Sequence, residues 1–352
     1  MKLLVTALVA LAVLANACAP SAAPPPKASE IQAEPKAAAP APAQQKPAAP
    51  PITVKYAVPN ANPDYLPVYA AMEKGFFKQE NIEMDIILIP TGDKLSAALI
   101  GGSLDVARYA PDPTMRAVEM GEKLTIVLGG TNTPTYSLIT QKDVKSYNDL
   151  KGKLVGVSSL SSSDAYFTRK MLAANGLKDK VDYDLIQVGG TPERVAALRA
   201  GSIAGALLLP PQDQRTVDEG LSRLDTATNV VKTYAWSMHT VKRDWAEKNE
   251  AALLALSRAF IKGTRWVYDP KNKEEGISIL MQQTKLEDKY ARQVFDTYIK
   301  SSTWDKDGAI SVPGLQAVID ALAESGDLKP PLPKVEKFID TSYWDKAMKT
   351  LQ

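Results

Sequence analysis

A run of serines that leads into a predicted helix carries the clearest chemistry in this sequence. Residues 158–164 read SSLSSSD, and the pattern after them predicts a helix over residues 164–175. Hydroxyls and free backbone amides at the start of a helix bind oxyanions such as carboxylates, sulfonates and phosphates. The same residues also suit an ordinary helix cap, and the sequence leaves both interpretations open. The candidate ligand contacts in this run are Ser158, Ser161, Ser162, Ser163 and Asp164.

Other candidate ligand contacts follow the ends of predicted strands or lie in the segment around residues 234–236. Open α/β sheets bind ligands beyond the carboxyl ends of their strands, which is why these loops are selected. Their acidic members disfavour a simple anion and suit an amine or a heterocycle, whereas their aromatic members can stack on a flat ligand. Each also has an ordinary alternative as a solvated carboxylate, a capping threonine or a core aromatic. These candidates are Asp64, Tyr65, Thr91, Gly92, Pro111, Asp112, Thr131, Thr133, Pro210, Tyr234 and Trp236.

Neither a catalytic site nor a metal or cofactor site is predicted. The chain has one histidine, His239, and one cysteine, Cys18, which leaves little for a transition-metal site or a Cys/His nucleophile. Arg108 lies within a predicted strand and pairs either with an anion or with a buried aspartate. The formal net charge is only +2 and no basic stripe is present, so no nucleic-acid partner is indicated.

The elements that must position these residues alternate between strand and helix patterns. This alternation predicts βαβ units, mainly parallel sheets and an α/β fold. The expected strands cover residues 52–58, 84–89 (a buried strand), 105–109, 124–128, 154–157, 183–188 and 204–209. The expected helices between them cover residues 67–74, 94–100, 113–120 and 164–175, with a further helix capped by Thr191. From Asp244 a helical extension is predicted over residues 244–268, 274–283, 286–300, 312–325 and 343–351.

Two stretches of the chain resemble each other. Residues 98–107 (ALIGGSLDVA) and 197–206 (ALRAGSIAGA) each follow a threonine-started helix and read helix, Gly-Ser turn and strand. Such junctions also arise by chance, because turn chemistry recurs for physical reasons. If the similarity is real, the chain contains two similar α/β lobes.

Four segments resemble the periplasmic substrate-binding proteins of ABC importers. The nearest group is the nitrate, sulfonate and taurine binding family, which also contains thiamine-pyrimidine and riboflavin binders. The matching segments are Leu66–Phe77 (LPVYAAMEKGFF), Ala97–Ala107 (AALIGGSLDVA), Tyr147–Val157 (YNDLKGKLVGV) and Leu198–Pro211. The chain departs from the family at Ala204-Gly205, where Asp-Ala is common, and this weakens any transfer of ligand residues from a named member.

The resemblance implies a two-lobed periplasmic binding protein fold, with helices on both faces of mainly parallel sheets and a helical C-terminal extension. Lobe 1 is expected over residues 52–139 and 241–352, and lobe 2 over residues 140–240, with crossings near residues 138–142 and 235–242. It also implies a binding protein, not an enzyme, whose lobes close on a ligand like a hinge. The implied partners are an ABC permease and its ATPase, and the chain itself is expected to be a monomer.

The N-terminus reads as an export signal followed by a lipid anchor. A charge at Lys2, an apolar run and the small residues before Cys18 predict a signal peptide over residues 1–17. A lone cysteine at this place predicts a lipidated (palmitate-bearing) residue, although a soluble periplasmic protein with an incidental thiol is the alternative. Residues 18–51, rich in Pro and Ala, predict a disordered tether. The expected location is the outer face of a cell membrane, with inner and outer membranes left open.

The expected function is therefore that of a membrane-tethered lipoprotein that captures a small organic solute for an importer. A sulfonate, a carboxylate or an aromatic or heterocyclic compound suits the candidate loops. Two alternatives remain from the sequence: a ligand-sensing module that reports to a partner, and an enzyme similar to a pyrimidine synthase. The second is disfavoured because such an enzyme uses histidine and a cysteine-rich iron site.

Overall fold

The computed structural model describes residues 50–351. The predicted signal peptide, Cys18 and the tether up to Ala49 lie outside the described residues. Within residues 50–351, no helix is long and apolar enough to cross a membrane.

Two five-stranded sheets with the same layout form the framework. Sheet A has the order β2-β1-β3-β10-β4 and sheet B the order β7-β6-β8-β5-β9. In each, four strands run in the same direction, and the fourth strand of the order runs antiparallel to both of its neighbours. The strands of sheet A are β1 (Ile52–Val58), β2 (Ile82–Leu88), β3 (Val106–Tyr109), β4 (Leu124–Thr131) and β10 (Ser237–Lys242). Those of sheet B are β5 (Ser137–Thr140), β6 (Leu154–Val157), β7 (Asp184–Gln187), β8 (Gly205–Leu208) and β9 (Ser222–Thr226).

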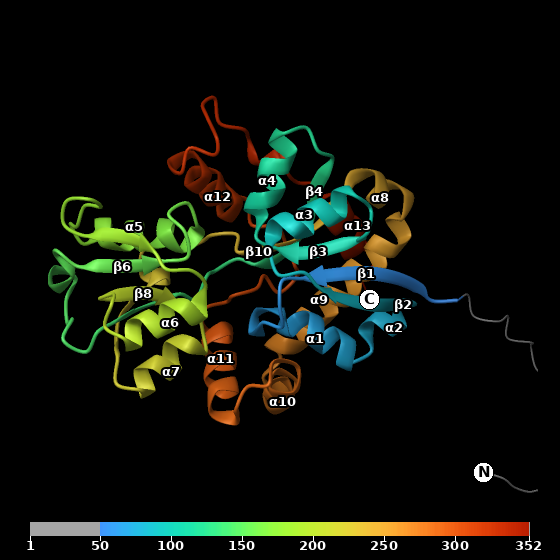
Figure 1. The fold of residues 1–352 in the computed structure, drawn as a ribbon. Helices are drawn as coiled ribbons and strands as arrows, with labels where there is room; N and C mark the ends of the chain where they lie inside the picture. The colour runs from blue at the N-terminus through green and yellow to red at the C-terminus, as the bar shows by residue number, and fades with distance from the viewer. Residues whose placement is uncertain (1–49, 352) are drawn as a thin grey trace, which may run out of the picture. The chain divides into compact units, whose positions relative to one another are not determined.

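The antiparallel strand of each sheet follows a crossing from the other sheet. β5 follows β4 through residues 132–136, and β10 follows β9 through residues 227–236. We call sheet A with its helices the first lobe, and sheet B with its helices the second lobe (Figure 1). The predicted two-lobed α/β fold is confirmed, but the sheets are mixed, because each crossing delivers a strand that runs opposite to its neighbours.

Helices cover both faces of each sheet, as predicted. In the first lobe, Val54, Tyr56 and Val58 of β1 face one core, and the intervening Ala57 faces another, as strand alternation requires. The first core also holds α1 (Leu66–Glu73), α2 (Phe76–Gln79), α9 (Glu250–Tyr268), α10 (Lys273–Thr284) and α11 (Asp288–Lys300). α3 (Gly92–Ile100) and α4 (Pro111–Glu119) cover the other face, and α12 (Val312–Glu324) packs against α4.

The second lobe is covered in the same way. α5 (Ser163–Ala174) packs on the face of sheet B that carries Val155 and Leu207, whereas α6 (Thr191–Arg199) packs on the face that carries Ala206 and Leu208. α7 (Gln212–Asp218) follows β8. Two further helices pack on the first lobe. α8 (Arg243–Lys248) lies next to β10, and α13 (Ser342–Lys349) packs on α9 and β4.

Three local predictions need correction. β2 lies at the edge of sheet A and is only partly buried, because its outer side has no neighbouring strand. The single helix expected over residues 244–268 is two helices, which meet at Asn249, whose backbone leaves helical geometry at φ −124° and ψ 33°. Thr191 is the first residue of α6, not its cap; Gly190 occupies the cap position and contributes no side-chain hydrogen bond.

The internal similarity extends to matching hydrogen bonds. The hydroxyl of Ser103 donates to the carbonyl of Ala98 at 3.1 Å, and that of Ser202 donates to the carbonyl of Ala197 at 3.1 Å. Each serine follows a glycine with positive φ, at 73° and 70°. Since the two sheets also share one strand order, the two stretches occupy equivalent places in two similar lobes.

The contact between α1 and α9 gives a first testable prediction. A Cβ atom on Gly263 would lie 2.4 Å from the carbonyl oxygen of Pro67 and 2.8 Å from the Cβ of Ala71, so the helices would have to separate. We expect Gly263→Ala to lower the free energy of unfolding by about 1–3 kcal/mol, although alanine favours helices. Urea unfolding measures this. Gly101→Ala, where the nearest atom is a carbonyl at 3.3 Å, is the control and should unfold like the parent.

Candidate functional site

A groove at the start of α5 gathers the serine run and three neighbouring elements. Its volume is about 720 Å³. α5 and the loop before it form one wall, α12 forms the other, and the start of α4 and the second crossing segment close it. We call it the serine groove. It is lined by Asp112, Ser159, Leu160, Ser161, Ser162, Ser163, Tyr166, Arg169, Gln187, Tyr234, Ala321, Leu322, Glu324 and Ser325.

Asp164 fixes the shape of the serine run. The Ser158 amide donates to Asp164 Oδ2 at 2.9 Å, and the hydroxyls of Ser158 and Ser162 donate to Asp164 Oδ1. Arg194 of α6 lies 3.3 Å from Asp164 Oδ2 and donates to the carbonyl of Gly189 at 2.8 Å. The side chains of Asp164 and Arg194 are only 3% and 4% exposed. Ser158 and Asp164 therefore hold the loop in place, and Ser162 caps α5 by accepting from the Ala165 amide.

The serines on either side of this cap are free to meet a ligand. The hydroxyls of Ser161 and Ser163 line the serine groove and make no hydrogen bond within residues 50–351. α5 has 12 residues, and its amide dipoles favour negative charge at this end. Tyr166 and Tyr234, whose ring centroids are 5.8 Å apart, supply aromatic surface beside the hydroxyls. The groove can therefore hold an oxyanion at the helix start and a flat group against the tyrosines.

The charged side chains of the serine groove already have partners. Arg169 pairs with Asp179 at 3.0 Å and donates to the carbonyl of Leu160. Asp112 pairs with Arg116 at 3.0 Å. Glu324 of α12 pairs with Lys170 of α5 at 2.5 Å, which links the two walls of the groove. Neutral hydroxyls and amides, not an unpaired cation, are thus the ligand-facing polar groups.

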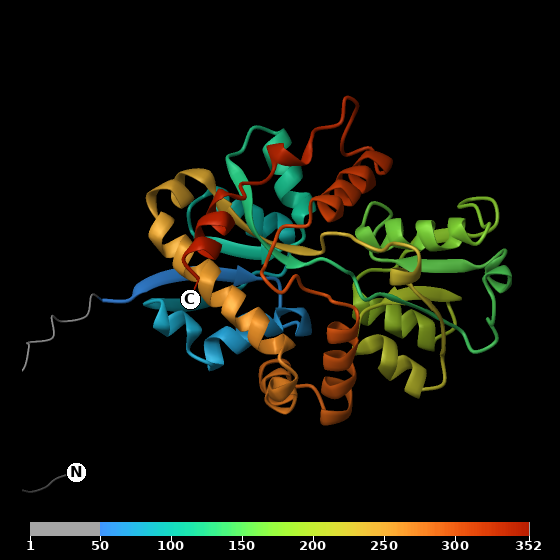
Figure 2. The same ribbon diagram turned by 180° about the vertical axis from the view of Figure 1, so that it is seen from behind.

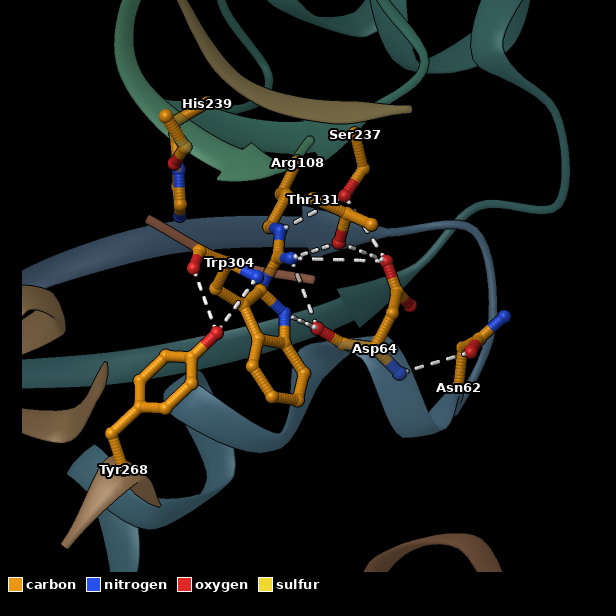
Figure 3. A network of polar contacts seen from close by, with 9 residues as sticks. Asn62, Asp64, Arg108, Thr131, Ser237, His239, Tyr268 and Trp304 are labelled. Carbon is orange, nitrogen blue, oxygen red and sulfur yellow. Dashed lines mark hydrogen bonds and ion pairs between the residues drawn. The ribbon is translucent and has the colours of Figure 1, made fainter. Parts of the chain in front are cut away.

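Asp64 and Thr131 belong to a buried network beneath the crossing segments (Figure 3). Arg108 donates to the Ser237 hydroxyl at 3.2 Å and to the Thr131 hydroxyl at 2.8 Å. Both hydroxyls then donate to Asp64 Oδ2, at 3.1 and 2.9 Å. Of the two partners considered for Arg108, the buried aspartate is therefore correct. Burial raises the pKa of Asp64, although Arg108 and the two hydroxyls act in the opposite direction.

The remaining candidates lie apart from the serine groove. Tyr65 is a core residue under the Arg108 guanidinium, which is 4.9 Å from its ring centroid. Thr91 caps α3, which was the ordinary alternative to a ligand contact, Gly92 begins that helix against Pro113, and Pro111 is buried in the first turn of α4. A small cavity of about 10 Å³ touches Asp64, Thr131, Thr133 and Trp236. Thr133 and Pro210 also line a second large groove, on the side of α7 and α11.

Sequence reasoning missed Arg194, Arg169 and the wall formed by α12. Arg194 meets Asp164 across 30 positions of sequence, and nothing in its own helix pattern marks that contact. Ala321 to Ser325 approach the serine run only because α12 packs against α4. One signal could have found Arg194. It lies in the first turns of α6, which follows β7, and β7 is the neighbour of β6, the strand that leads into the serine run.

The single histidine has a structural place. His239 is fully buried in β10, and its Nδ1 lies 2.7 Å from the carbonyl oxygen of Gly129. Burial lowers the pKa of His239 to about 3, and the positive charge of Arg108 acts in the same direction. Within residues 50–351, no group of three His, Cys, Asp or Glu side chains could hold a metal ion.

His239 gives a second prediction. Folding lowers the pKa of His239, so protonation favours the unfolded chain. The free energy of unfolding therefore has its full value above about pH 6.5 and falls as the pH drops below that value. We expect the one histidine ring signal in NMR spectra to stay constant from pH 8 to about pH 5. Titration of this signal near pH 6.5 in the folded protein would contradict the buried, neutral ring. His239→Gln should remove the corresponding part of the acid destabilisation.

Comparison with protein families gives one match that spans most of the chain. The model of the NMT1-like family matches residues 49–281. Binding protein YtlA of Bacillus subtilis is 21% identical over 274 residues, which cover 76% of this chain and 82% of YtlA. The nitrate/nitrite binding protein NrtA of Synechococcus elongatus is 26% identical over 275 residues, covering 69% of this chain but only 58% of NrtA.

Solved structures with the same fold include proteins that are binding proteins by their titles, and one that is a desulfurization enzyme, DSZB, with a TM-score of 0.67 at 13% identity, covering 85% of this chain and 99% of that one. The ligand-binding component of an ABC-type import system from Staphylococcus aureus superposes with a TM-score of 0.69, covering 84% of this chain and 98% of that one, at 15% identity. The periplasmic aliphatic sulphonate binding protein SsuA of Escherichia coli gives a TM-score of 0.65, covering 84% and 99%, at 18% identity. At such identities the likeness shows the fold, which is the one expected from the sequence.

An enzyme also appears among the relatives, over a shorter stretch. The 4-amino-5-hydroxymethyl-2-methylpyrimidine phosphate synthase of Schizosaccharomyces pombe is 35% identical over 99 residues, which cover 27% of this chain and 28% of the enzyme. YtlA and NrtA, which match 76% and 69% of the chain, are binding proteins by name. This confirms the prediction of a binding protein and not an enzyme.

Proposed function

The chain belongs to the NMT1-like family, and from this premise we propose that it is the substrate-binding component of an ABC import system. It captures a small organic solute in the serine groove and delivers it to a permease that is driven by an ATPase. The solute class that fits the groove is a sulfonate, a carboxylate or an aromatic or heterocyclic compound with an oxyanion. The nitrate-binding name of a relative and the sulphonate-binding title of a solved structure with the same fold support an anionic solute.

One observation carries the proposal: free hydroxyls at the start of a long helix, inside a groove with one wall from each lobe. Ser161 and Ser163 belong to the second lobe, and α12 packs on the first. A ligand that contacts both walls favours the arrangement in which they are close, and its differential affinity drives closure. The Lys170–Glu324 pair spans the same two walls, but at 38% and 47% side-chain exposure it contributes at most about 1 kcal/mol.

The proposal includes a place outside the cytoplasm. The signal peptide predicted over residues 1–17 and the relation to periplasmic binding proteins support export. Lipidation of Cys18 would hold the protein at the membrane surface, near the permease, and residues 18–51 would serve as the tether. Metabolic labelling with radioactive palmitate tests this, and the Cys18→Ser variant should remain unlabelled.

A ligand screen tests the proposed function. The chain from Ala19 onward is heated with sulfonates, aromatic acids, pyrimidines, flavins and inorganic anions, and the unfolding midpoint is recorded. Ligand at about 100 times its Kd stabilises the fold by about 2.7 kcal/mol, which is readily seen. We expect one class to raise the midpoint, and the Ser161→Ala/Ser163→Ala variant to bind it about tenfold more weakly. If no compound acts on folded, ligand-free protein, transport of these solutes is excluded and the ligand-sensing alternative gains support.

A further inference from the structure

A second groove of about 720 Å³ lies on the side of α7 and α11. We call it the lysine groove. Figures 1 and 2 show α5 and α12 on one side of the crossing segments and α7 and α11 on the other. The second lobe contributes Pro210, Pro211, Asp213, Gln214, Arg223 and Thr226 to it, and the second crossing segment contributes Thr228, Asn229 and Lys232. The wall from α11 and its C-terminal turn comprises Tyr290, Gln293, Val294, Asp296, Thr297, Lys300 and Ser301, and Thr133, Thr135 and Ser137 come from the first crossing and β5.

The positive charge of this groove is not neutralised. Arg223 pairs with the buried Asp213 at 2.9 Å, and Asp296 pairs with Lys273 at 2.6 Å. Lys232 and Lys300 make no ion pair or side-chain hydrogen bond within residues 50–351. The charges that remain are therefore those of these two lysines, one from each wall. In the serine groove, by contrast, every charged side chain is paired.

The groove also offers unpaired amide and apolar surface. The Gln293 side chain makes no hydrogen bond within the described part of the chain, and its Oε1 is buried without a partner. Because the two ends of an amide differ only by a flip, Gln293 can turn its NH2 group or its oxygen to a ligand. Pro210, Pro211, Val294 and the Tyr290 ring supply apolar lining. Lone cations over such a surface recognise a negative head with an apolar tail.

We propose that the lysine groove is a second ligand site, separate from the serine groove, that takes a small organic anion with an apolar tail. The anionic head lies between Lys232 and Lys300 and accepts from the amide of Gln293. The tail packs on the two prolines and Tyr290. Such a ligand bridges the lobes where Lys289 and Tyr290 of α11 already contact Asp218 of α7, at 2.5 and 3.1 Å.

Calorimetric titration of the chain from Ala19 onward with hexanoate tests this site. Acetate lacks the tail, hexanol lacks the charge and hexylammonium reverses it, so we expect hexanoate to bind more tightly than all three. Lys232→Gln/Lys300→Gln should weaken hexanoate binding by at least about tenfold. The matched control is Lys151→Gln/Lys178→Gln, which removes two exposed lysines that line neither groove and should leave binding unchanged.

The proposal is overturned by any of four results. These are no hexanoate binding up to about 10 mM, equal binding of hexanol, an unchanged affinity in Lys232→Gln/Lys300→Gln, or loss of affinity in Ser161→Ala/Ser163→Ala. The last result would place the anion in the serine groove. Circular dichroism of each variant confirms that the fold is intact before its affinity is compared.

Discussion

Replacing Arg108 with methionine is expected to lower the free energy of unfolding by about 3–5 kcal/mol, one of the two largest effects on stability that the structure indicates. Arg108 is fully buried and Asp64 is 4% exposed, so water cannot solvate the Asp64 carboxylate when the guanidinium is removed. The variant leaves Asp64 with two hydroxyl donors and no positive charge within reach. It also leaves the Asp64 carbonyl without the Arg108 contact at 3.0 Å. Urea unfolding at pH 7 measures the loss.

The pH dependence of this loss has a defined sign. The pKa of Asp64 is already raised by burial, and removing Arg108 raises it further, so the folded variant binds a proton more tightly than the unfolded chain. Lowering the pH therefore favours the folded variant, and its deficit should be smaller at pH 5 than at pH 7. Asp64→Asn/Arg108→Met, which removes both charges, should recover part of the stability.

A matched control separates burial from charge. Arg199 forms a close pair with Glu219, but the two side chains are 54% and 42% exposed. Arg199→Met should therefore cost no more than about 1 kcal/mol. A loss of that small size in Arg108→Met as well would contradict the view that the buried network holds the ends of β3, β4 and β10 together.

Replacing Arg194 with methionine is expected to weaken ligand binding in the serine groove, although every ligand-facing hydroxyl is retained. Arg194 holds Asp164, and Asp164 holds Ser158 and Ser162, so the serine run loses the anchor that fixes its shape. We expect an affinity loss of more than about tenfold for the compound found in the screen. Since the pair is buried, the free energy of unfolding should also fall, by about 3–5 kcal/mol.

The conservative variant separates position from charge. Arg194→Lys keeps the positive charge near Asp164, where Nη1 of the arginine also donates to the carbonyl of Gly189, but it lacks the second guanidinium nitrogen, Nη2, which donates to the hydroxyl of Thr191. It should therefore retain more stability than Arg194→Met. Titration calorimetry with both variants below their unfolding midpoints gives the affinities. Binding as tight as the parent in both would show that the serine run holds its shape without α6.

Local patterns in the sequence were sufficient for most strands and helices. The strand over residues 52–58 and the strand over residues 154–157 have the predicted bounds, because alternation and flanking turns mark them within a few residues. What local patterns could not supply is the direction in which distant strands pair. β5 and β10 lie where crossings between the lobes were expected, near residues 138–142 and 235–242, and their positions between partners that run the opposite way make the sheets mixed.

The candidate site was predictable to the same extent. The composition of the serine run and its place before a helix marked it as a candidate site, and the structure puts four of its serines, Ser159 and Ser161 to Ser163, in one groove. Asp64 could not be assigned from the sequence, because its partner Arg108 is 44 positions away and contacts it both directly, at 3.7 Å, and through hydroxyls from β4 and β10. The ion pair that links the two walls of the serine groove could not be predicted either, because its partners are also far apart in the sequence.

The return of the chain to sheet A after sheet B is complete has a consequence for how the chain reaches its native state. β10 lies between β3 and β4, yet β4 ends at Thr131 and β10 begins at Ser237. Sheet A is therefore incomplete until nearly 240 residues are available, and its central contacts are long-range in sequence, a topology that slows folding. A fragment ending before Ser237 would expose unpaired edges of β3 and β4, which invite aggregation. The second lobe has all five strands of its sheet within residues 137–226, so it is the part expected to fold first.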